Sequence, residues 1–159
     1  TCYNGLFRVN ASGAFNAPFG SYKNPNIVNE PVLRAVSAYF NAARITFFSR
    51  DFQQVLEELP RGAFVYLDPP YDPVSQTASF TGYSNGGFGR EEQLRLKECC
   101  DSLNRRGIRF LLSNSATPFI RELYSSYEIT LVDARRAINS VGDRRGAIQE
   151  VLVKNYGTK

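Results

Sequence analysis

The chain has 159 residues, of which 43% are hydrophobic and 21% charged, and this suits one compact domain rather than a disordered or fibrous chain. No apolar run approaches the roughly 18–20 residues that span a bilayer. The absence of His excludes histidine acid–base catalysis, and Cys2, Cys99 and Cys100 form no zinc-binding set, so reduced thiols in a cytoplasmic protein are expected and no metal is predicted.

The net charge of +4 is unevenly distributed, with two basic ends around an acidic middle. Residues 1–50 and 135–159 each carry +4, whereas residues 51–134 carry −4, and 15 of the 19 basic residues are Arg. Because the planar guanidinium suits phosphates and guanine edges, this pattern is compatible with nucleic-acid binding as well as with ordinary surface charge.

The first 50 residues predict an irregular N-terminal part followed by a helix. Residues 1–29 lack a sustained period, although NASG at 10–13 could turn a hairpin. Apolar residues at helical spacing predict a helix over 30–43, with Asn29 as its N-cap and Pro31 in its first turn. The run ITFFS predicts a short strand over 45–49.

The remaining sequence alternates helical and strand patterns. The apolar run 62–68 ends in Asp68 and suits a parallel strand covered on both faces, and the loop 72–89 that follows is long enough to indicate a functional segment. Strands are further predicted over 108–113, 128–132 and 147–153, and helices over 52–59, 90–106 and 118–124. This order implies an α/β domain with a mostly parallel sheet, whose ligands would bind beyond the strand ends where Asp68 and Asn114 lie.

The tetrad Asp68-Pro69-Pro70-Tyr71 carries the most specific chemistry. Two consecutive prolines lack N–H donors and hold φ at about −65°, so the turn is stiff and presents carbonyls. Asp68 and the Pro69 carbonyl could each accept one hydrogen of an exocyclic amine while Tyr71 stacks on its planar ring, which would align the nitrogen with an electrophilic methyl group. The structural alternative is a turn in which Asp68 caps backbone amides and Tyr71 is buried.

The tetrad resembles the catalytic signature of S-adenosylmethionine-dependent amino-group methyltransferases, and the rest of the chain resembles the DNA adenine methylase (Dam) family, which methylates adenine N6 in GATC. The resemblance covers nearly the whole chain in the family's order. Its segments are YNGL at 3–6, FNAPFGSYKNP at 15–25, SRDF at 49–52, DPPYDPVSQTASFTGY at 68–83, FLLSNS at 110–115 and ARRAINSVGDRRGAIQEVLVKNY at 134–156.

The resemblance implies the C-terminal part of a Rossmann-like methyltransferase fold, with residues 1–29 as part of the DNA-recognition lobe and residues 30–159 as part of the catalytic domain. The family's Phe-x-Gly-x-Gly cofactor turn is absent from the sequence. Gly86-Gly87-Phe88-Gly89 does not replace it, because no strand precedes that run. We therefore expect these 159 residues alone to bind S-adenosylmethionine poorly and to turn over little or not at all.

The resemblance also implies residue roles. Asp68, Pro69, Pro70 and Tyr71 would hold and activate a flipped adenine, and Asp51 and Phe52, together with Asp68, would contact the cofactor. The residues implied to contact DNA are Tyr3, Asn4, Arg8, Pro18, Ser21, Arg135 and Arg136.

Several of these residues could instead have a purely structural role. Arg8 could bond nearby carbonyls instead of reading a guanine, Asp51 could cap the following helix, and Phe80 and Tyr83 could anchor their loop instead of lining a base pocket. The basic residues Arg135, Arg136, Arg144 and Arg145 could grip phosphates or form a solvated face.

The resemblance thus implies a prokaryotic or phage enzyme of DNA methylation or restriction–modification that acts as a monomer on double-stranded DNA. Ser21 stands where Dam-like proteins commonly have an Arg that reads the outer base pair, which weakens the expectation of strict GATC selectivity. The alternatives are a methyltransferase for an RNA base or a protein amide, and a catalytically silent DNA-binding module.

Overall fold

A computed structural model of the chain describes residues 9–10, 12–16, 23, 26, 28–74, 88–135 and 147–157. The chain divides into two compact units, Thr1–Phe48 and Ser49–Lys159. The assignment of 1–29 and 30–159 to two functional domains stays a prediction. In the described residues, no helix is long and apolar enough to cross a membrane.

The first unit contains a short turn and one helix. Val9 and Phe15 form an antiparallel bridge, and between them the Asn10 side chain accepts hydrogen bonds from the backbone N–H groups of Ser12 and Ala14, as expected for the hairpin turn predicted at 10–13. Helix α1 spans Glu30–Ala42, within one residue of the prediction.

Asn29 occupies the N-cap position of α1, but its side chain makes no capping hydrogen bond, so that part of the prediction is wrong. Its backbone, at φ −81° and ψ 72°, departs from the extended geometry typical of a capping residue. Pro31 lies in the first turn, as predicted. None of the residues of α1 is buried.

The strand predicted over 45–49 does not form, since residues 44–49 belong to no helix or strand. A strand exists only where a neighbour satisfies its backbone groups, and none of the described sheet pairings includes this segment. Phe47, at 74% exposure, lies at the surface. Apolar, β-prone sequence was therefore not sufficient here.

The second unit confirms the remaining predicted elements, with bounds that differ by one to three residues. In chain order they are α2 Phe52–Glu57, β1 Phe64–Leu67, α3 Arg90–Arg105, β2 Arg109–Ser115, α4 Pro118–Leu123, β3 Glu128–Arg135 and β4 Ala147–Lys154. Asn114, predicted to follow its strand, is the penultimate residue of β2.

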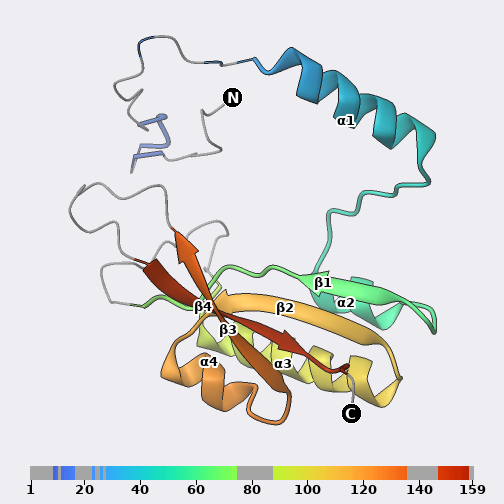
Figure 1. Ribbon diagram of the computed structural model, residues 1–159, viewed down its shortest axis with the longest axis vertical. Coiled ribbons are helices and arrows are strands. Elements are labelled where there is room, and N and C mark those ends of the chain that lie inside the picture. Colours follow the sequence, from blue (N-terminus) through green and yellow to red (C-terminus); the bar gives the residue numbers. More distant parts are fainter. Residues whose placement is uncertain are drawn as a thin grey trace. The chain divides into compact units, whose positions relative to one another are not determined.

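The four strands form one sheet in the order β1-β2-β4-β3 (Figure 1). The α/β class is confirmed, but the prediction of a mostly parallel sheet needs correction, because β1 pairs with β2 in parallel whereas β4 is antiparallel to both β2 and β3. Strands β1, β2 and β3 share one direction. The last strand inserts between β2 and β3 in the opposite direction, which sequence periodicity cannot reveal.

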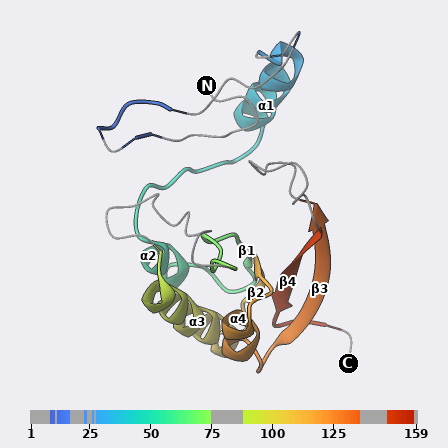
Figure 2. The same ribbon diagram turned by 90° about the vertical axis from the view of Figure 1, so that its left-hand side faces the viewer.

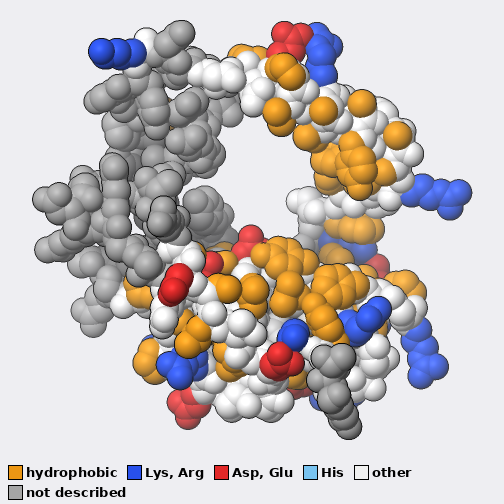
Figure 3. Space-filling view, in the orientation of Figure 1, with side chains coloured by type: hydrophobic (Ala, Val, Ile, Leu, Met, Phe, Trp, Pro, Cys, Tyr) orange, Lys and Arg blue, Asp and Glu red, His pale blue; other side chains and the backbone are white. Residues whose placement is uncertain are grey.

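Helices α2, α3 and α4 lie on one face of this sheet (Figure 2). Their apolar sides and the facing strand residues form the core, in which Leu103, Ile108, Phe110, Leu112 and Val153 are fully buried. On β1, alternate residues Phe64 and Tyr66 are exposed while Val65 is buried. Hydrophobic side chains are correspondingly visible at the surface near β1 (Figure 3).

Candidate functional site

The predicted catalytic tetrad begins at the carboxyl end of β1. Leu67, the last residue of β1, pairs with Leu112 of the parallel strand β2, so the residues after these two positions meet at one edge of the sheet. There the Ser113 hydroxyl donates to Asp68 Oδ1 at 2.9 Å and lies 3.2 Å from the Tyr66 hydroxyl. The Asp68 side chain is exposed rather than turned inward, and its second carboxylate oxygen can accept a further hydrogen bond.

The two prolines present their carbonyls differently. The Pro70 carbonyl accepts a hydrogen bond from Gln93 Nε2 at 2.9 Å. No donor in the described segments bonds to the Pro69 carbonyl. The turn therefore has one carbonyl occupied by the protein and the other open as an acceptor next to Asp68.

Tyr71 is half-buried, and its hydroxyl lies 3.5 Å from Glu150 Oε2 on β4. Burial raises the pKa of the Tyr71 phenol, and the carboxylates of Glu150 and Asp68 raise it further, although a hydrogen bond with Ser113 opposes them. The phenol is therefore neutral at ordinary pH, and Tyr71 offers an uncharged aromatic ring beside the Asp68 carboxylate.

The corner thus combines two acceptors, the Asp68 carboxylate and the Pro69 carbonyl, with the Tyr71 ring. Two acceptors suit the two hydrogens of a planar amine, and an aromatic ring suits stacking on the heterocycle that carries it. The described residues contain no group of three or more His, Cys, Asp or Glu that could hold a metal ion.

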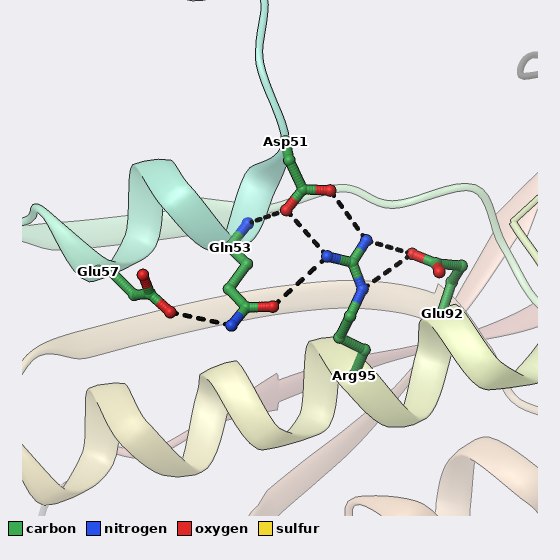
Figure 4. Close-up of polar contacts among 5 residues, drawn as sticks. All are labelled: Asp51, Gln53, Glu57, Glu92 and Arg95. Atoms are coloured by element: carbon green, nitrogen blue, oxygen red, sulfur yellow. Dashed lines mark hydrogen bonds and ion pairs between the residues drawn. The ribbon is translucent and has the colours of Figure 1, made fainter.

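A second predicted group, Asp51 and Phe52, lies at the start of α2. Figure 4 shows Asp51 with the polar side chains around it. Asp51 accepts a hydrogen bond from the backbone N–H of Gln53 at 2.9 Å, so the predicted helix cap is confirmed. Both Asp51 carboxylate oxygens are also bound by the Arg95 guanidinium of α3, each at 2.9 Å.

Arg95 organises this group. Its guanidinium carbon lies 4.2 Å from the centroid of the Phe52 ring, and it also bonds to Glu92. The hydrogen bonds from Arg95 are the main cause that lowers the pKa of Asp51. Since Gln93 reaches Pro70 from the same turn of α3, this helix brings the two predicted groups into one structural unit.

The Asp51 side chain meets the requirements of an adenosine-containing cofactor. A carboxylate has about four acceptor sites, and the three hydrogen bonds from Gln53 and Arg95 leave one of them. That side chain is 40% exposed, and Phe52 supplies an aromatic surface beside it. The residues present therefore fit the cofactor's amino group and ring.

A hollow of about 100 Å³ between α2 and α3 does not coincide with either group. Its lining includes Gln53, Glu57, Arg95 and Arg106 but none of the residues predicted for catalysis. Charges of both signs line it, so it offers no complement to one ligand class, and the sheet edge at Asp68 remains the better candidate.

The predicted DNA-contacting residues are not tested. Tyr3, Asn4, Arg8, Pro18, Ser21 and Arg136 lie outside the described residues, as do Phe80, Tyr83, Arg144 and Arg145. Arg135 is the last residue of β3, and only its backbone is described.

Sequence reasoning missed Ser113, Gln93 and Arg95. Ser113 follows the position of β2 that pairs with the end of β1, so the rule that parallel strand ends share an edge could have found it. Gln93 falls on the apolar stripe of α3 with Leu96 and Leu103, and a polar residue there is a signal in itself. Arg95 carried no comparable local signal.

Comparison with known proteins identifies the family to which the chain is similar. A family model described as "D12 class N6 adenine-specific DNA methyltransferase" matches residues 1–138. The chain is 43% identical over 155 residues to the Type II methyltransferase M1.LlaDCHI of Lactococcus lactis subsp. cremoris, covering 98% of the chain and 55% of the relative.

Two further relatives carry related names. The DNA N-6-adenine-methyltransferase of Escherichia phage P1 is 40% identical over 154 residues, covering 95% of the chain and 20% of that protein. The DNA adenine methylase of Escherichia coli K12 is 37% identical over 150 residues, covering 94% of the chain and 53% of that protein. The chain thus spans about half the length of most of the relatives cited. Given a match over most of its length, it belongs to the D12 class of N6 adenine-specific DNA methyltransferases.

Proposed function

We propose that the complete protein containing this chain is a DNA methyltransferase that transfers a methyl group from S-adenosylmethionine to N6 of a flipped adenine in double-stranded DNA. The observation that carries the proposal is the corner at the end of β1. There an exposed Asp68 carboxylate and an open Pro69 carbonyl lie next to the Tyr71 ring, within a chain of the adenine-specific family.

In this proposal the chain's own residues hold the amine. Asp68 and the Pro69 carbonyl each accept one amino hydrogen, which draws electron density onto the nitrogen and orients its lone pair. Tyr71 stacks on the extruded base, and such stacking offsets part of the cost of extrusion. The Ser113 hydrogen bond holds one Asp68 oxygen, so the other is directed toward the amine.

Asp51 and Phe52 would hold the adenosine part of S-adenosylmethionine, with Arg95 fixing the Asp51 carboxylate. When bound, this cofactor supplies the electrophilic methyl group. The residues Tyr3, Asn4, Arg8, Pro18, Ser21, Arg135 and Arg136 would contact DNA, with Arg8 reading a guanine.

We further propose GATC as the target, with relaxed reading of its outer base pair because Ser21 cannot make a bidentate arginine contact. The relatives come from bacteria, an archaeon and a phage, which favours action in a prokaryotic cytoplasm. From the resemblance to Dam-like enzymes we further propose that the protein acts as a monomer on DNA.

The test is Asp68→Asn in the complete protein. Because a neutral amide is a weaker acceptor than the carboxylate and stabilises less of the charge that develops on the nitrogen, we expect methyl transfer to fall by roughly a hundredfold or more, while DNA affinity stays near the wild-type value. Glu122→Gln, an exposed acid on α4, serves as the control and should leave both unchanged.

Transfer is read by digestion of treated DNA with methylation-sensitive nucleases, and affinity by fluorescence anisotropy. Wild-type transfer by the Asp68→Asn variant contradicts the proposed role of Asp68. Methylated RNA or protein with unmodified DNA contradicts the proposed substrate.

A further inference from the structure

The residues on both sides of Tyr71 form hydrogen bonds with buried amide side chains. Before it, the Pro70 carbonyl accepts from Gln93 Nε2 of α3 at 2.9 Å. After it, the Asp72 backbone N–H donates to Asn114 Oδ1 of β2, also at 2.9 Å. The backbone on either side of the Tyr71 ring is therefore attached to two different elements of the core.

The two amides are joined to each other, and this fixes which way each of them faces. Asn114 Oδ1 accepts from the backbone N–H groups of Asp72 and Ser115, so its Nδ2 must point away from them. Asn114 Nδ2 donates to Gln93 Oε1 at 3.1 Å, and Gln93 Nε2 is thereby directed to the Pro70 carbonyl. We call this chain of hydrogen bonds, from Asp72 through Asn114 and Gln93 to Pro70, the amide relay. Only one orientation of each amide satisfies every donor and acceptor in it.

Burial makes the relay hard to replace. Gln93 is 1% exposed and Asn114 is fully buried, so water cannot take over the hydrogen bonds of either amide. A buried amide without a partner is strongly disfavoured. The lowest-energy arrangement of this region is therefore one in which Pro70 and Asp72 stay attached.

A third attachment ties the same segment to α4. Asp72 is 5% exposed, and its side chain accepts from the Thr117 hydroxyl at 2.6 Å. Thr117 also caps α4 by accepting from the N–H of Ile120. The segment after Tyr71 is thus bound to both β2 and α4. Within the described residues, none of the hydrogen bonds that tie this segment to the core involves the Pro69 carbonyl or the Asp68 carboxylate, the two groups proposed to hold the amine.

We infer that Gln93 and Asn114 are positioning residues that hold the Tyr71 ring and the Pro69 carbonyl in register with Asp68, and thereby set the rate of methyl transfer rather than the affinity for DNA. This inference rests on the proposed function. In this inference a buried amide pair controls the geometry of the amine, although α3 and β2 contribute no proposed substrate contact of their own.

The test uses Gln93→Met, which retains side-chain length and packing but removes the donor to Pro70 and the acceptor for Asn114. Because the corner is then less well aligned, we expect kcat of the complete protein to fall by about tenfold to a hundredfold. KM for S-adenosylmethionine and Kd for target DNA should stay within roughly twofold. Asn114→Asp, which keeps the acceptor for Asp72 but loses the donor to Gln93, should lower kcat in the same way.

The matched control is Asn155→Ala. The Asn155 side chain is also an amide that bonds to backbone groups, since it accepts from the N–H of Phe110 and donates to the Ile108 carbonyl. These bonds lie at the other end of β2. Its loss should lower the melting temperature and leave kcat unchanged, which separates general destabilisation from loss of positioning.

A second readout does not depend on methyl transfer. Amide hydrogen exchange is followed by NMR in the 159-residue chain. Relative to the wild type, Gln93→Met should speed exchange at the Asp72 N–H, which is bonded to Asn114 Oδ1, by at least about tenfold, and should leave exchange at the core amide of Leu112 nearly unchanged. If this variant does not fold, Asn114→Asp takes its place in both measurements.

The outcomes are distinct. A lowered kcat at unchanged KM and Kd, with locally faster exchange, supports the inference. Wild-type kcat in both Gln93→Met and Asn114→Asp overturns the inference and leaves the proposed function intact. The inference is also overturned if Asn155→Ala, at the same melting temperature as these variants, loses as much kcat as they do. A complete wild-type protein that methylates no DNA overturns the proposed function itself, and the inference falls with it.

Discussion

The Asp51 carboxylate serves two partners at once, the N-terminus of α2 and the Arg95 guanidinium. Both interactions favour the charged form, and they lower the pKa of Asp51 below its ordinary value of 3.8, with Arg95 as the main cause. A lowered pKa in the folded state means that the charged carboxylate stabilises the fold at every pH above its unfolded-state pKa. That stabilisation is lost as the pH falls through the folded-state value.

We therefore predict that Asp51→Asn lowers the melting temperature at pH 7 and that the gap to the wild type closes below about pH 3.8. Asn retains helix-capping ability, so the variant isolates the ion pair. Thermal unfolding between pH 2.5 and 7 measures the gap, and Asp133→Asn, an exposed acid on β3, is the control. A gap that is independent of pH would contradict the assignment.

The two halves of helix α3 make different contacts. Its N-terminal half carries Gln93 and Arg95, which reach the tetrad and Asp51, and its C-terminal half buries Cys100 and Leu103 in the core. The helix ends where Gly107 takes a left-handed φ of +70°, after which the Ile108 N–H bonds back to the Leu103 carbonyl at 2.9 Å. A glycine with left-handed backbone directly after the last turn is a common way for a helix to end.

We predict that Gly107→Ala lowers the free energy of unfolding by about 1–2 kcal/mol, the usual cost of left-handed backbone in a residue with Cβ. No heavy atom lies within 4 Å of an added Cβ, so the effect would come from the backbone alone. Gly107→Asn should lose less, because Asn tolerates this conformation. Urea unfolding measures both, and an equal loss in the two variants would point to a cause other than φ.

At the scale of the whole molecule, the hydrophobic core belongs to one unit. Every buried hydrophobic residue among the described ones lies between Leu56 and Val153, whereas α1 in the first unit buries none of its residues. Folding stability follows buried apolar area, so the described part of residues 1–48 contributes little to it.

We accordingly predict that a chain of residues 49–159 alone unfolds cooperatively in urea, with a free energy of unfolding within roughly 1 kcal/mol of the 159-residue chain, close to the error of such extrapolations. The comparison needs only the two chains under identical conditions. A non-cooperative transition, or a much larger loss, would show that the first unit supports the core.

Much of the fold was predictable from the sequence because its signals are local. Helical spacing located α3 and α4 to within about a residue, and the apolar run ending in Asp68 located β1 and the tetrad. The cap at Asp51 also followed from neighbouring residues alone. In each case the groups that interact are within a few positions of each other, so the local sequence is enough to predict the feature.

The remaining features depend on partners far apart in the sequence. The insertion of β4 between β2 and β3, the missing strand at 45–49 and the contacts of Arg95 with Asp51 and of Gln93 with Pro70 all join or require distant segments. Local periodicity is the same whichever segments meet. The candidate site was thus predictable from the sequence of one tetrad. The orientation of that tetrad was decided by tertiary packing, because the buried amides and the guanidinium meet their hydrogen-bond partners only in the folded chain.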